Sequence, residues 1–127
     1  MSQFVYEKFG FERLNVYQES IKIVNLTYQI SKKFPKEEMF GLTNQLRRAS
    51  TSIALNIAEG SARTKKDFAH FLSLAKGSCF ECVAIIDICK QQNLISESEF
   101  SIIYEQLNKI SRMISKFQAS LRNTKNE

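Results

Sequence analysis

Apolar residues recur at spacings of three and four along four segments of the chain, a pattern typical of amphipathic helices. The first helix is predicted from about Leu14 to Lys33. Its two neighbouring apolar stripes consist of Leu14, Tyr17, Ile21, Val24 and Tyr28, and of Val16, Ile23 and Ile30. This helix should end at Phe34-Pro35, because proline disfavours helical geometry in the residue before it.

The second helix is predicted over residues 37–59, where Glu37 and Glu38 suit the positive end of the helix dipole. Its inner face should be formed by Leu42, Leu46, Ala49, Ile53 and Ile57. Gly60 follows, and glycine accepts the left-handed backbone that often ends a helix. We therefore expect Gly60 to be the C-terminal stop.

The third helix is predicted over residues 65–92, after Thr64, which forms an approximate capping box with Asp67. Its main apolar stripe is Phe68, Leu72, Ala75, Cys79, Cys82, Ile86 and Cys89, and a flanking stripe is Phe71, Leu74, Ile85 and Ile88. Together the stripes cover roughly 200° of the helix. That is more than a helix with one side in water requires.

The fourth helix is predicted over residues 97–121, after a capping box between Ser96 and Glu99. Its apolar stripe is Phe100, Ile103, Leu107, Ile110, Ile114, Phe117 and Leu121. No segment alternates apolar and polar residues over the length of a strand, and the breaks are short. The pattern predicts one all-α domain over residues 1–127, an up-down-up-down antiparallel four-helix bundle.

Composition agrees with a globular protein: 43% of the 127 residues are hydrophobic and 24% are charged. No apolar run is long enough for a membrane span. The three cysteines are an odd number, which favours reduced thiols and a cytoplasmic protein. The net charge of +5 favours a polyanionic partner without identifying one.

Candidate catalytic chemistry is scarce, and we expect no enzyme, cofactor or metal. His70 is the single histidine, so a hydrolytic triad is improbable. Cys79 and Cys82 resemble half of a zinc site whose second pair is missing. Because all three cysteines lie on the main apolar stripe of the third helix, core packing is the better interpretation.

Basic residues form three clusters: Arg47 beside Arg48 on the second helix, Arg63, Lys65 and Lys66 before the third, and Lys109, Arg112 and Lys116 on the fourth. The last three lie within about 60° of one another and roughly 150° from the apolar stripe of their helix. Such a stripe could contact phosphates. A solvated charged face is the alternative, since Glu105 can pair with Lys109.

One run of residues carries a family resemblance. It consists of Gln45-Leu46-Arg47-Arg48-Ala49, then Ser52-Ile53, then Asn56-Ile57-Ala58-Glu59-Gly60, with Phe68, Phe71-Leu72, Ala75 and Gly77-Ser78 following. Over about residues 11–121 the chain resembles the 23S rRNA intervening-sequence proteins, which are four-helix bundle proteins.

The resemblance implies a four-helix bundle that assembles into a ring-shaped homopentamer. Some members of that family are encoded inside insertions in 23S rRNA genes. A related branch is the accessory protein of diversity-generating retroelements, which binds nucleic acid and a reverse transcriptase through a basic surface. The expected partners are therefore other copies of the chain, RNA and a reverse transcriptase, with no membrane.

Residues of the resembling run have structural interpretations that we prefer to ligand binding. Ser52 and Asn56 could hydrogen-bond across the bundle, and Gly77 with Ser78 could allow close helix approach. Arg48, Glu59 and Glu81 could form ion pairs at a subunit boundary. Phe80 lies away from the apolar stripes, which suggests an oligomer contact.

Two function classes remain open from the sequence. The first is an oligomer that binds RNA through Arg47, Arg63, Lys65, Lys66, Lys109, Arg112 and Lys116. The second is a structural or protein-interaction scaffold with no specific affinity for nucleic acid.

Overall fold

Four helices form the computed structural model, which describes residues 5–123. They are α1 (Asn15–Ser31), α2 (Asn44–Ser61), α3 (Lys65–Gln91) and α4 (Glu97–Asn123). A short 3-10 helix, Gly10–Arg13, precedes α1. No strand occurs between residues 5 and 123. The predicted domain also includes residues 1–4 and 124–127, which lie outside the described residues.

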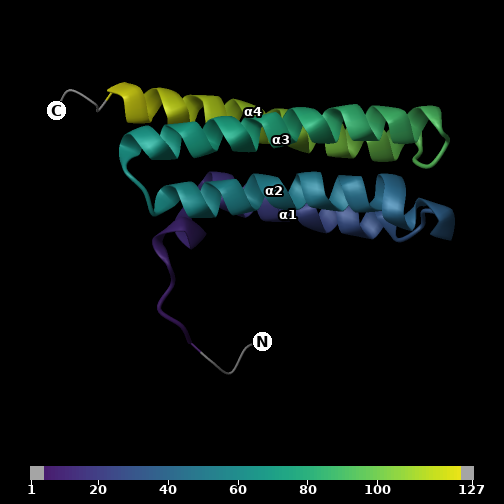
Figure 1. Cartoon of the computed structure of the whole chain (residues 1–127), viewed down its shortest axis with the longest axis horizontal. Helices are drawn as coiled ribbons and strands as arrows, with labels where there is room; N and C mark the ends of the chain where they lie inside the picture. The colour runs from purple at the N-terminus through teal and green to yellow at the C-terminus, as the bar shows by residue number, and fades with distance from the viewer. Residues whose placement is uncertain (1–4, 124–127) are drawn as a thin grey trace.

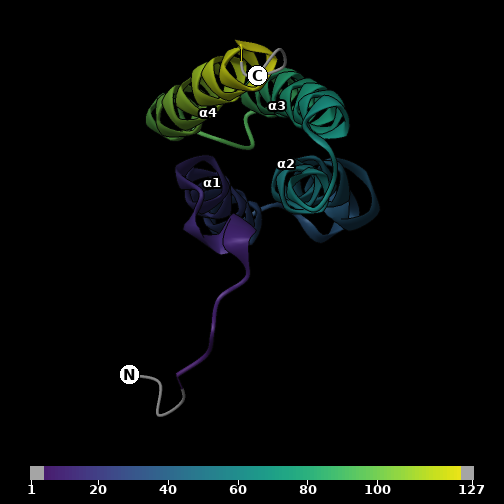
Figure 2. The ribbon, with the colours of Figure 1, turned by 90° about the vertical axis from the view of Figure 1, so that its left-hand side faces the viewer.

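The helices stack as two layers, with α1 beside α2 and α3 beside α4 (Figure 1). Each helix contacts two neighbours, through the pairs α1–α2, α2–α3, α3–α4 and α1–α4. The end-on view shows the four helices at the corners of a bundle (Figure 2). The four-helix bundle predicted from the sequence is confirmed.

The core confirms the main apolar stripes of the last two helices. Leu72 and Ile86 of α3 and Ile103 and Ile110 of α4 are fully buried. Burying an aliphatic side chain of this size stabilises the fold by about 1.5–3 kcal/mol. Both capping interactions are present: the amide of Asp67 donates to Thr64 Oγ1 at 3.2 Å, and that of Glu99 donates to Ser96 Oγ at 3.1 Å.

One of the two predicted apolar stripes of α1 forms its fully buried face. The second stripe, Val16, Ile23 and Ile30, faces the core, whereas Tyr28 of the first stripe is 41% exposed. Thr27 takes the fully buried position instead, because its hydroxyl is satisfied by the Val24 carbonyl at 3.0 Å and by Ser50 Oγ at 2.8 Å. A paired hydroxyl can occupy a core position that a count of apolar residues assigns elsewhere.

The second helix begins later than predicted. Residues Lys36–Glu38 form a 3-10 turn and Met39–Thr43 a wider turn, so α2 starts at Asn44 rather than at residue 37. Gly41 interrupts the helical path, with φ −111° and ψ −112°. Glycine is the residue that most readily leaves helical geometry, because it has no Cβ.

Glycines 60 and 77 have the opposite roles to those expected. Gly60 does not stop α2 in a left-handed conformation; it lies inside the helix and is buried. A Cβ at Gly60 would lie 2.6 Å from Phe71 Cβ, so glycine here permits close contact between α2 and α3. A Cβ at Gly77 would meet no atom within 4 Å, and the expected close approach at Gly77 is wrong.

Polar side chains join each pair of neighbouring helices. The links are Thr27–Ser50 for α1–α2, Ser52–Ser78 for α2–α3, Gln118–Ser73 for α3–α4 and Glu19–Gln106 for α1–α4. In the described part of the chain, no buried side-chain nitrogen or oxygen lacks a hydrogen-bond partner. Satisfied polar contacts of this kind fix the register of helices that apolar packing alone would leave free to slide.

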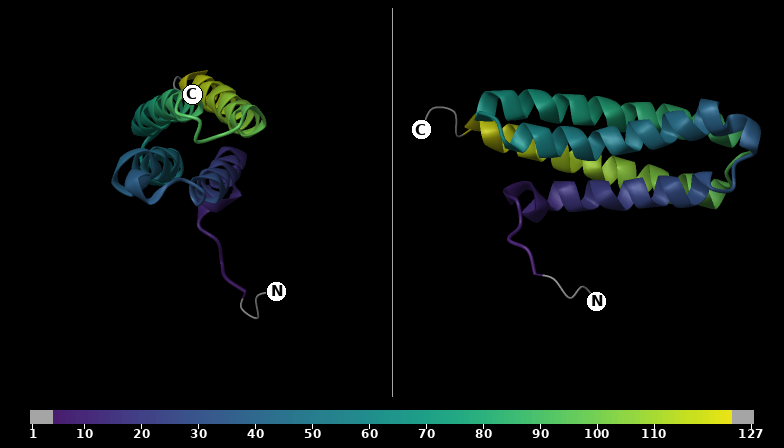
Figure 3. Two further views of the ribbon diagram at one scale, coloured as in Figure 1. Left: turned by 90° about the vertical axis from the view of Figure 1, so that its right-hand side faces the viewer. Right: turned by 60° about the horizontal axis from the view of Figure 1, so that its bottom comes forward.

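Residues 5–9 form an extended arm that leaves the bundle beside the start of α1 (Figure 3). The arm points away from the layer of α3 and α4 (Figure 2). Its base is held by the 3-10 helix, where the amide of Phe9 donates to the Glu12 carboxylate at 2.9 Å. The Phe11 ring also packs edge-on against Tyr17, with 4.9 Å between ring centroids.

Candidate nucleic-acid interface

The seven cations proposed from the sequence occupy three places on the bundle. Arg47 lies in the first turn of α2, and Arg63, Lys65 and Lys66 lie at the α2–α3 turn at the other end. Sixteen residues separate Arg47 from Arg63, which corresponds to about 24 Å along a helix. The remaining three, Lys109, Arg112 and Lys116, lie between the middle of α4 and its C-terminal end.

Arg47 is held by the bundle itself. Its Nε donates to Ser31 Oγ at 2.8 Å, and its guanidinium lies 4.6 Å from the centre of the Tyr28 ring. The side chain therefore links α2 to the end of α1. It is separate from the other candidate cations and already engaged.

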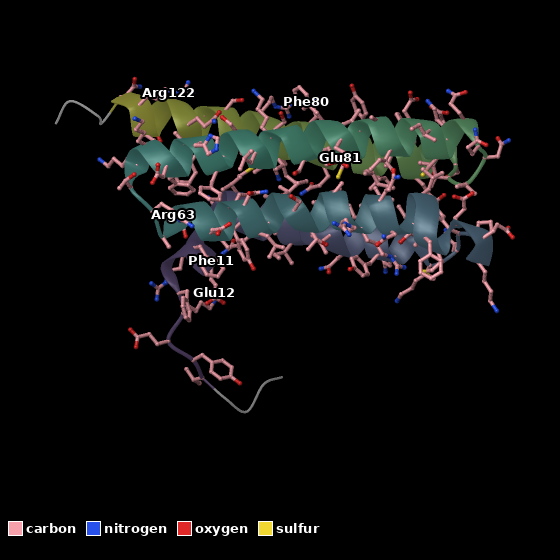
Figure 4. The ribbon with its side chains drawn as sticks, viewed as in Figure 1. Phe11, Glu12, Arg63, Phe80, Glu81 and Arg122 are labelled. Carbon is pink, nitrogen blue, oxygen red and sulfur yellow. The ribbon has the colours of Figure 1, made fainter. Side chains whose placement is uncertain are left out.

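The α2–α3 turn presents three exposed cations. Arg63 pairs with Glu59 at 3.3 Å and lies over the Phe71 ring at 5.1 Å. Figure 4 shows Arg63 at the end of the bundle where α2 meets α3. Lys65 and Lys66 are exposed in the first turn of α3. The Arg63 pair is solvent-exposed, so it contributes little stability and can be broken at small cost.

On α4, Lys109 differs from its neighbours. Its Nζ lies 2.9 Å from Glu19 Oε1, so its charge is neutralised across the α1–α4 contact. Hydrogen bonds from Lys22, Gln106 and Lys109 lower the pKa of Glu19 from its ordinary value of 4.5 to about 2. Arg112 and Lys116 are exposed and have no ion-pair partner among residues 5–123.

Arg112 and Lys116 border a shallow hollow of about 950 Å³ between α3 and α4. Lys76 of α3 also lines it, with its Nζ 2.7 Å from Ser115 Oγ. No carboxylate from the described residues lines this hollow. We name its four cations, Lys76, Lys109, Arg112 and Lys116, the α4 basic patch.

Sequence reasoning missed Lys76. Along its own helix Lys76 has no basic neighbour within a turn on the same face. It joins Arg112 and Lys116 only because α3 and α4 run antiparallel side by side. Finding Lys76 from the sequence would require the register of α3 against α4, which shows that it lies beside Arg112 and Lys116.

The residues of the family-like run gather on one face of α2 and α3, which we name the motif face. Its members include the polar residues Arg48, Ser52, Asn56, Glu59, Ser78 and Glu81, together with Gly77. Asn56 bonds within its helix to Ser52, at 3.0 Å between Nδ2 and Oγ, and Ser78 Oγ donates to Ser52 Oγ at 3.0 Å. Ser52 is therefore the residue that joins the two helices.

The charged members of the motif face form one ion pair within the described residues, and their pairing at a subunit boundary stays a prediction. Glu59 pairs with Arg63 of its own chain. Arg48 and Glu81 are exposed, and neither forms an ion pair within the described residues. Glu81 points out between α2 and α3 in Figure 4, beside the open surface at Gly77.

Phe80 lies on a different face from Glu81. It is 61% exposed and borders an apolar groove of about 550 Å³ between α3 and α4. The groove walls include Val83, Ala84, Phe100, Tyr104 and Leu107. We name this the α3–α4 groove; it shares Phe80, Asn108 and Ser111 with the hollow of the basic patch.

The cysteines pack in the core, as predicted. Cys79, Cys82 and Cys89 are buried and free. Burial raises the pKa of the Cys79 thiol to about 12 and that of Cys89 to about 11, and it also raises the pKa of Cys82. In the described part of the chain, no group of three or more His, Cys, Asp or Glu residues could hold a metal ion.

The helices are not membrane spans. Within residues 5–123, none combines the length and the apolar character that crossing a bilayer demands.

Residues 12–116 match the family model for the 23S rRNA-intervening sequence protein. The chain belongs to this family. A solved structure with the same fold is a protein of unknown function from the S23 ribosomal protein family of Bacteroides thetaiotaomicron. The two share 19% identity with a TM-score of 0.76, over 81% of this chain and 97% of that one. No curated protein matches the chain. Family membership and fold agree with the resemblance seen in the sequence.

Proposed function

We propose that this chain is a non-enzymatic bundle of the 23S rRNA-intervening sequence protein family that self-assembles and binds RNA, or a complex of RNA with a protein such as a reverse transcriptase. The α4 basic patch carries the proposal: four cations surround one hollow without a carboxylate. Such an arrangement attracts phosphates more strongly than scattered surface lysines do, because Lys109 is the one cation of the patch with an ion-pair partner among the described residues.

The proposal assigns different roles to the candidate cations inside and outside the patch. Arg112 and Lys116 would contact phosphates directly, with Lys66 at the α2–α3 turn as an outlying contact. Lys109 would contribute only after leaving Glu19, and Arg47 would not contribute. The family name refers to a ribosomal RNA insertion, which also favours RNA as the polyanion.

Self-assembly is supported by apolar side chains that the single bundle leaves exposed. Leu55 on α2 and Leu74 on α3 are 62% and 44% exposed, and both adjoin the motif face. Exposed apolar patches of this kind mark contacts with other chains. A pentamer would carry five times +5, about +25, which strengthens long-range attraction of RNA. The buried reduced thiols suit an assembly in the cytoplasm.

The second candidate is a scaffold with no specific affinity for nucleic acid. The observation in its favour is that Arg47, Arg63 and Lys109 all have partners within the chain. On this interpretation the cations serve packing and solubility.

Binding of a fluorescein-labelled RNA stem-loop, followed by anisotropy over a range of salt concentrations, separates the two candidates. We compare Arg112→Glu/Lys116→Glu with Lys32→Glu/Lys36→Glu, which makes the same change in net charge on exposed lysines in the α1–α2 region. The RNA-binding proposal expects loss of affinity only for the α4 variant. Equal losses for both variants would support the scaffold instead. Light scattering after nuclease treatment and a high-salt wash measures the number of chains in the assembly.

A further inference from the structure

The α3–α4 groove and the hollow of the basic patch are continuous, and together we name them the α3–α4 furrow. Both are lined by Phe80 of α3 and by Asn108 and Ser111 of α4. The lining residues of α4 that lie furthest apart, Phe100 in the groove and Ala119 in the hollow, are about 28 Å apart along the helix. The basic patch therefore occupies only one half of a longer surface.

The groove half of the furrow presents aromatic rings from both helices. Phe80 is 61% exposed and makes no ring contact with another residue between 5 and 123. Tyr104 is 43% exposed, and its ring stacks on that of Phe100 with 5.5 Å between centroids and 29° between planes. Exposed rings that line a groove provide flat apolar faces for a ligand.

We propose that an unpaired segment of RNA lies along the α3–α4 furrow, with a base stacked on Phe80 and the adjacent phosphates on the cations of the α4 basic patch. The inference rests on the proposed function, because it names the form of RNA that this patch binds.

Charge is distributed along the furrow as a nucleotide requires. The cations line the hollow, whereas Asp87 is the one carboxylate among the described residues that line the groove. Phosphates are attracted to the hollow and repelled by Asp87, so the backbone of the strand lies at the end of Lys76 and Arg112. A base carries no net charge and can lie in the groove, where Asp87 can accept a hydrogen bond from an amino group of its edge.

Unpaired RNA can use both halves of the furrow, whereas duplex RNA can use only the hollow. In a duplex the bases are stacked and paired within the helix, so phosphates and sugar hydroxyls meet the protein. An unpaired base exposes its ring faces and can stack on an aromatic side chain. Phe80 lines the same hollow as Lys76 and Arg112, so one short segment of RNA can contact the ring and the cations together.

A neighbouring copy of the chain is the competing occupant, because the sequence predicts an oligomer contact at Phe80. The exposed side chains that support self-assembly, Leu55 and Leu74, adjoin the motif face, whereas Phe80 lies in the furrow between α3 and α4. Assembly through the motif face would leave the furrow open to RNA. The number of chains in the assembly therefore has to be measured for each variant.

Anisotropy with three fluorescein-labelled RNAs tests the stacking contact in the full chain. The RNAs are an unpaired strand of about 12 nucleotides, the same strand paired with its complement, and the same strand with abasic sites. Phe80→Ala removes the ring. Phe40→Ala is the matched control, because Phe40 is 94% exposed and lines neither the groove nor the hollow.

We expect Phe80→Ala to weaken binding of the unpaired strand on the order of tenfold, because one base loses its stacking partner. Its affinity for the duplex and for the abasic strand should equal that of the unchanged protein, since those contacts involve phosphates. Phe40→Ala should bind all three RNAs as the unchanged protein does. Circular dichroism and light scattering check that the fold and the number of chains are retained.

A second pair of variants detects the stacked base directly. The chain contains no tryptophan, so Phe80→Trp introduces a single fluorophore in the furrow and Phe40→Trp a matched one outside it. A base stacked on an indole quenches its emission. The unpaired strand should therefore quench Phe80→Trp, with its affinity retained, and leave the emission of Phe40→Trp unchanged.

Three results would overturn the stacking contact, and they are distinguishable. If Arg112→Glu/Lys116→Glu abolishes binding while Phe80→Ala keeps full affinity for the unpaired strand and Phe80→Trp is not quenched, the proposed function stands without stacking. A loss of affinity in Phe80→Ala for all three RNAs, together with fewer chains in light scattering, would assign Phe80 to a contact between copies. Failure of the unchanged protein to bind any of the RNAs would refute the proposed RNA binding itself, and the stacking contact with it.

Discussion

Lys109 of α4 and Glu19 of α1 form an ion pair, with 2.9 Å between Nζ and Oε1. Gln106 strengthens this contact by donating to the main-chain oxygen and to the carboxylate of Glu19, both at 3.1 Å. Lys22 pairs with the other carboxylate oxygen at 2.7 Å. The carboxylate is largely covered, so it joins α1 to α4 rather than acting as a surface charge.

Stability should depend on pH through Glu19. Its pKa is about 2 in the folded chain against an ordinary value of 4.5, so the unfolded chain takes up the proton first. The stabilisation from Glu19 is therefore fully present above about pH 5 and is lost as the pH falls toward 2. Glu19→Gln should lower the free energy of unfolding by about 1 kcal/mol at pH 7 and by much less near pH 2.

Urea denaturation at several pH values measures this dependence. Glu105→Gln is the control, because Glu105 is exposed on α4 and takes no part in the Glu19 network. An equal loss of stability at neutral and acid pH in Glu19→Gln would contradict the ion-pair explanation.

Two glycine-to-alanine substitutions should have opposite effects. In Gly60→Ala, the added Cβ would lie 2.6 Å from Phe71 Cβ and 2.9 Å from Phe68 Cδ1, so α2 and α3 must separate. We expect a destabilisation of about 1–3 kcal/mol. In Gly77→Ala the added Cβ meets no atom within 4 Å, and the higher helix propensity of alanine should stabilise the chain by about 0.5–1 kcal/mol. Thermal unfolding of both variants checks the pair, and a shift of the same sign in both would be inconsistent with the observed packing.

The sequence predicted the number of helices and most of their bounds, because the apolar stripes of the last two helices are nearly uninterrupted. It failed where side chains act through a neighbouring helix. Thr27 takes a core position only because Ser50 of α2 satisfies its hydroxyl. The sequence predicts Gly60 as the C-terminal stop of α2, because nothing within that helix indicates that Phe71 packs over it.

In the candidate site, too, the sequence predicted features of a single helix and missed contacts between helices. Arg112 and Lys116 were predictable from their spacing on one helix. The neutralised state of Lys109 depends on Glu19 of α1, and the inclusion of Lys76 depends on the register of α3 against α4. Both depend on contacts between helices, and the spacing of residues along one helix does not reveal such contacts.

The three thiols should be unreactive in the folded protein. Cys79, Cys82 and Cys89 are buried, and their pKa values are raised by burial, so almost no thiolate exists at pH 7 to attack a reagent. We expect a colorimetric aromatic disulfide reagent to label the native chain very slowly and all three thiols rapidly in urea. Rapid labelling of any thiol without urea would show that the α3 core opens locally.

Arg112→Ala and Lys109→Ala should separate RNA binding from stability. Arg112 is exposed with no ion-pair partner among residues 5–123, so its loss should leave the urea midpoint unchanged. If it contacts a phosphate, the slope of log affinity against log salt should fall by about 1.

Lys109→Ala should instead lower the urea midpoint, because it removes the cation of α4 that pairs with Glu19. Its effect on the salt slope should be smaller, since its charge is already neutralised. A larger loss of slope for Lys109→Ala than for Arg112→Ala would mean that RNA displaces Glu19, and that the α1–α4 contact opens when the complex forms.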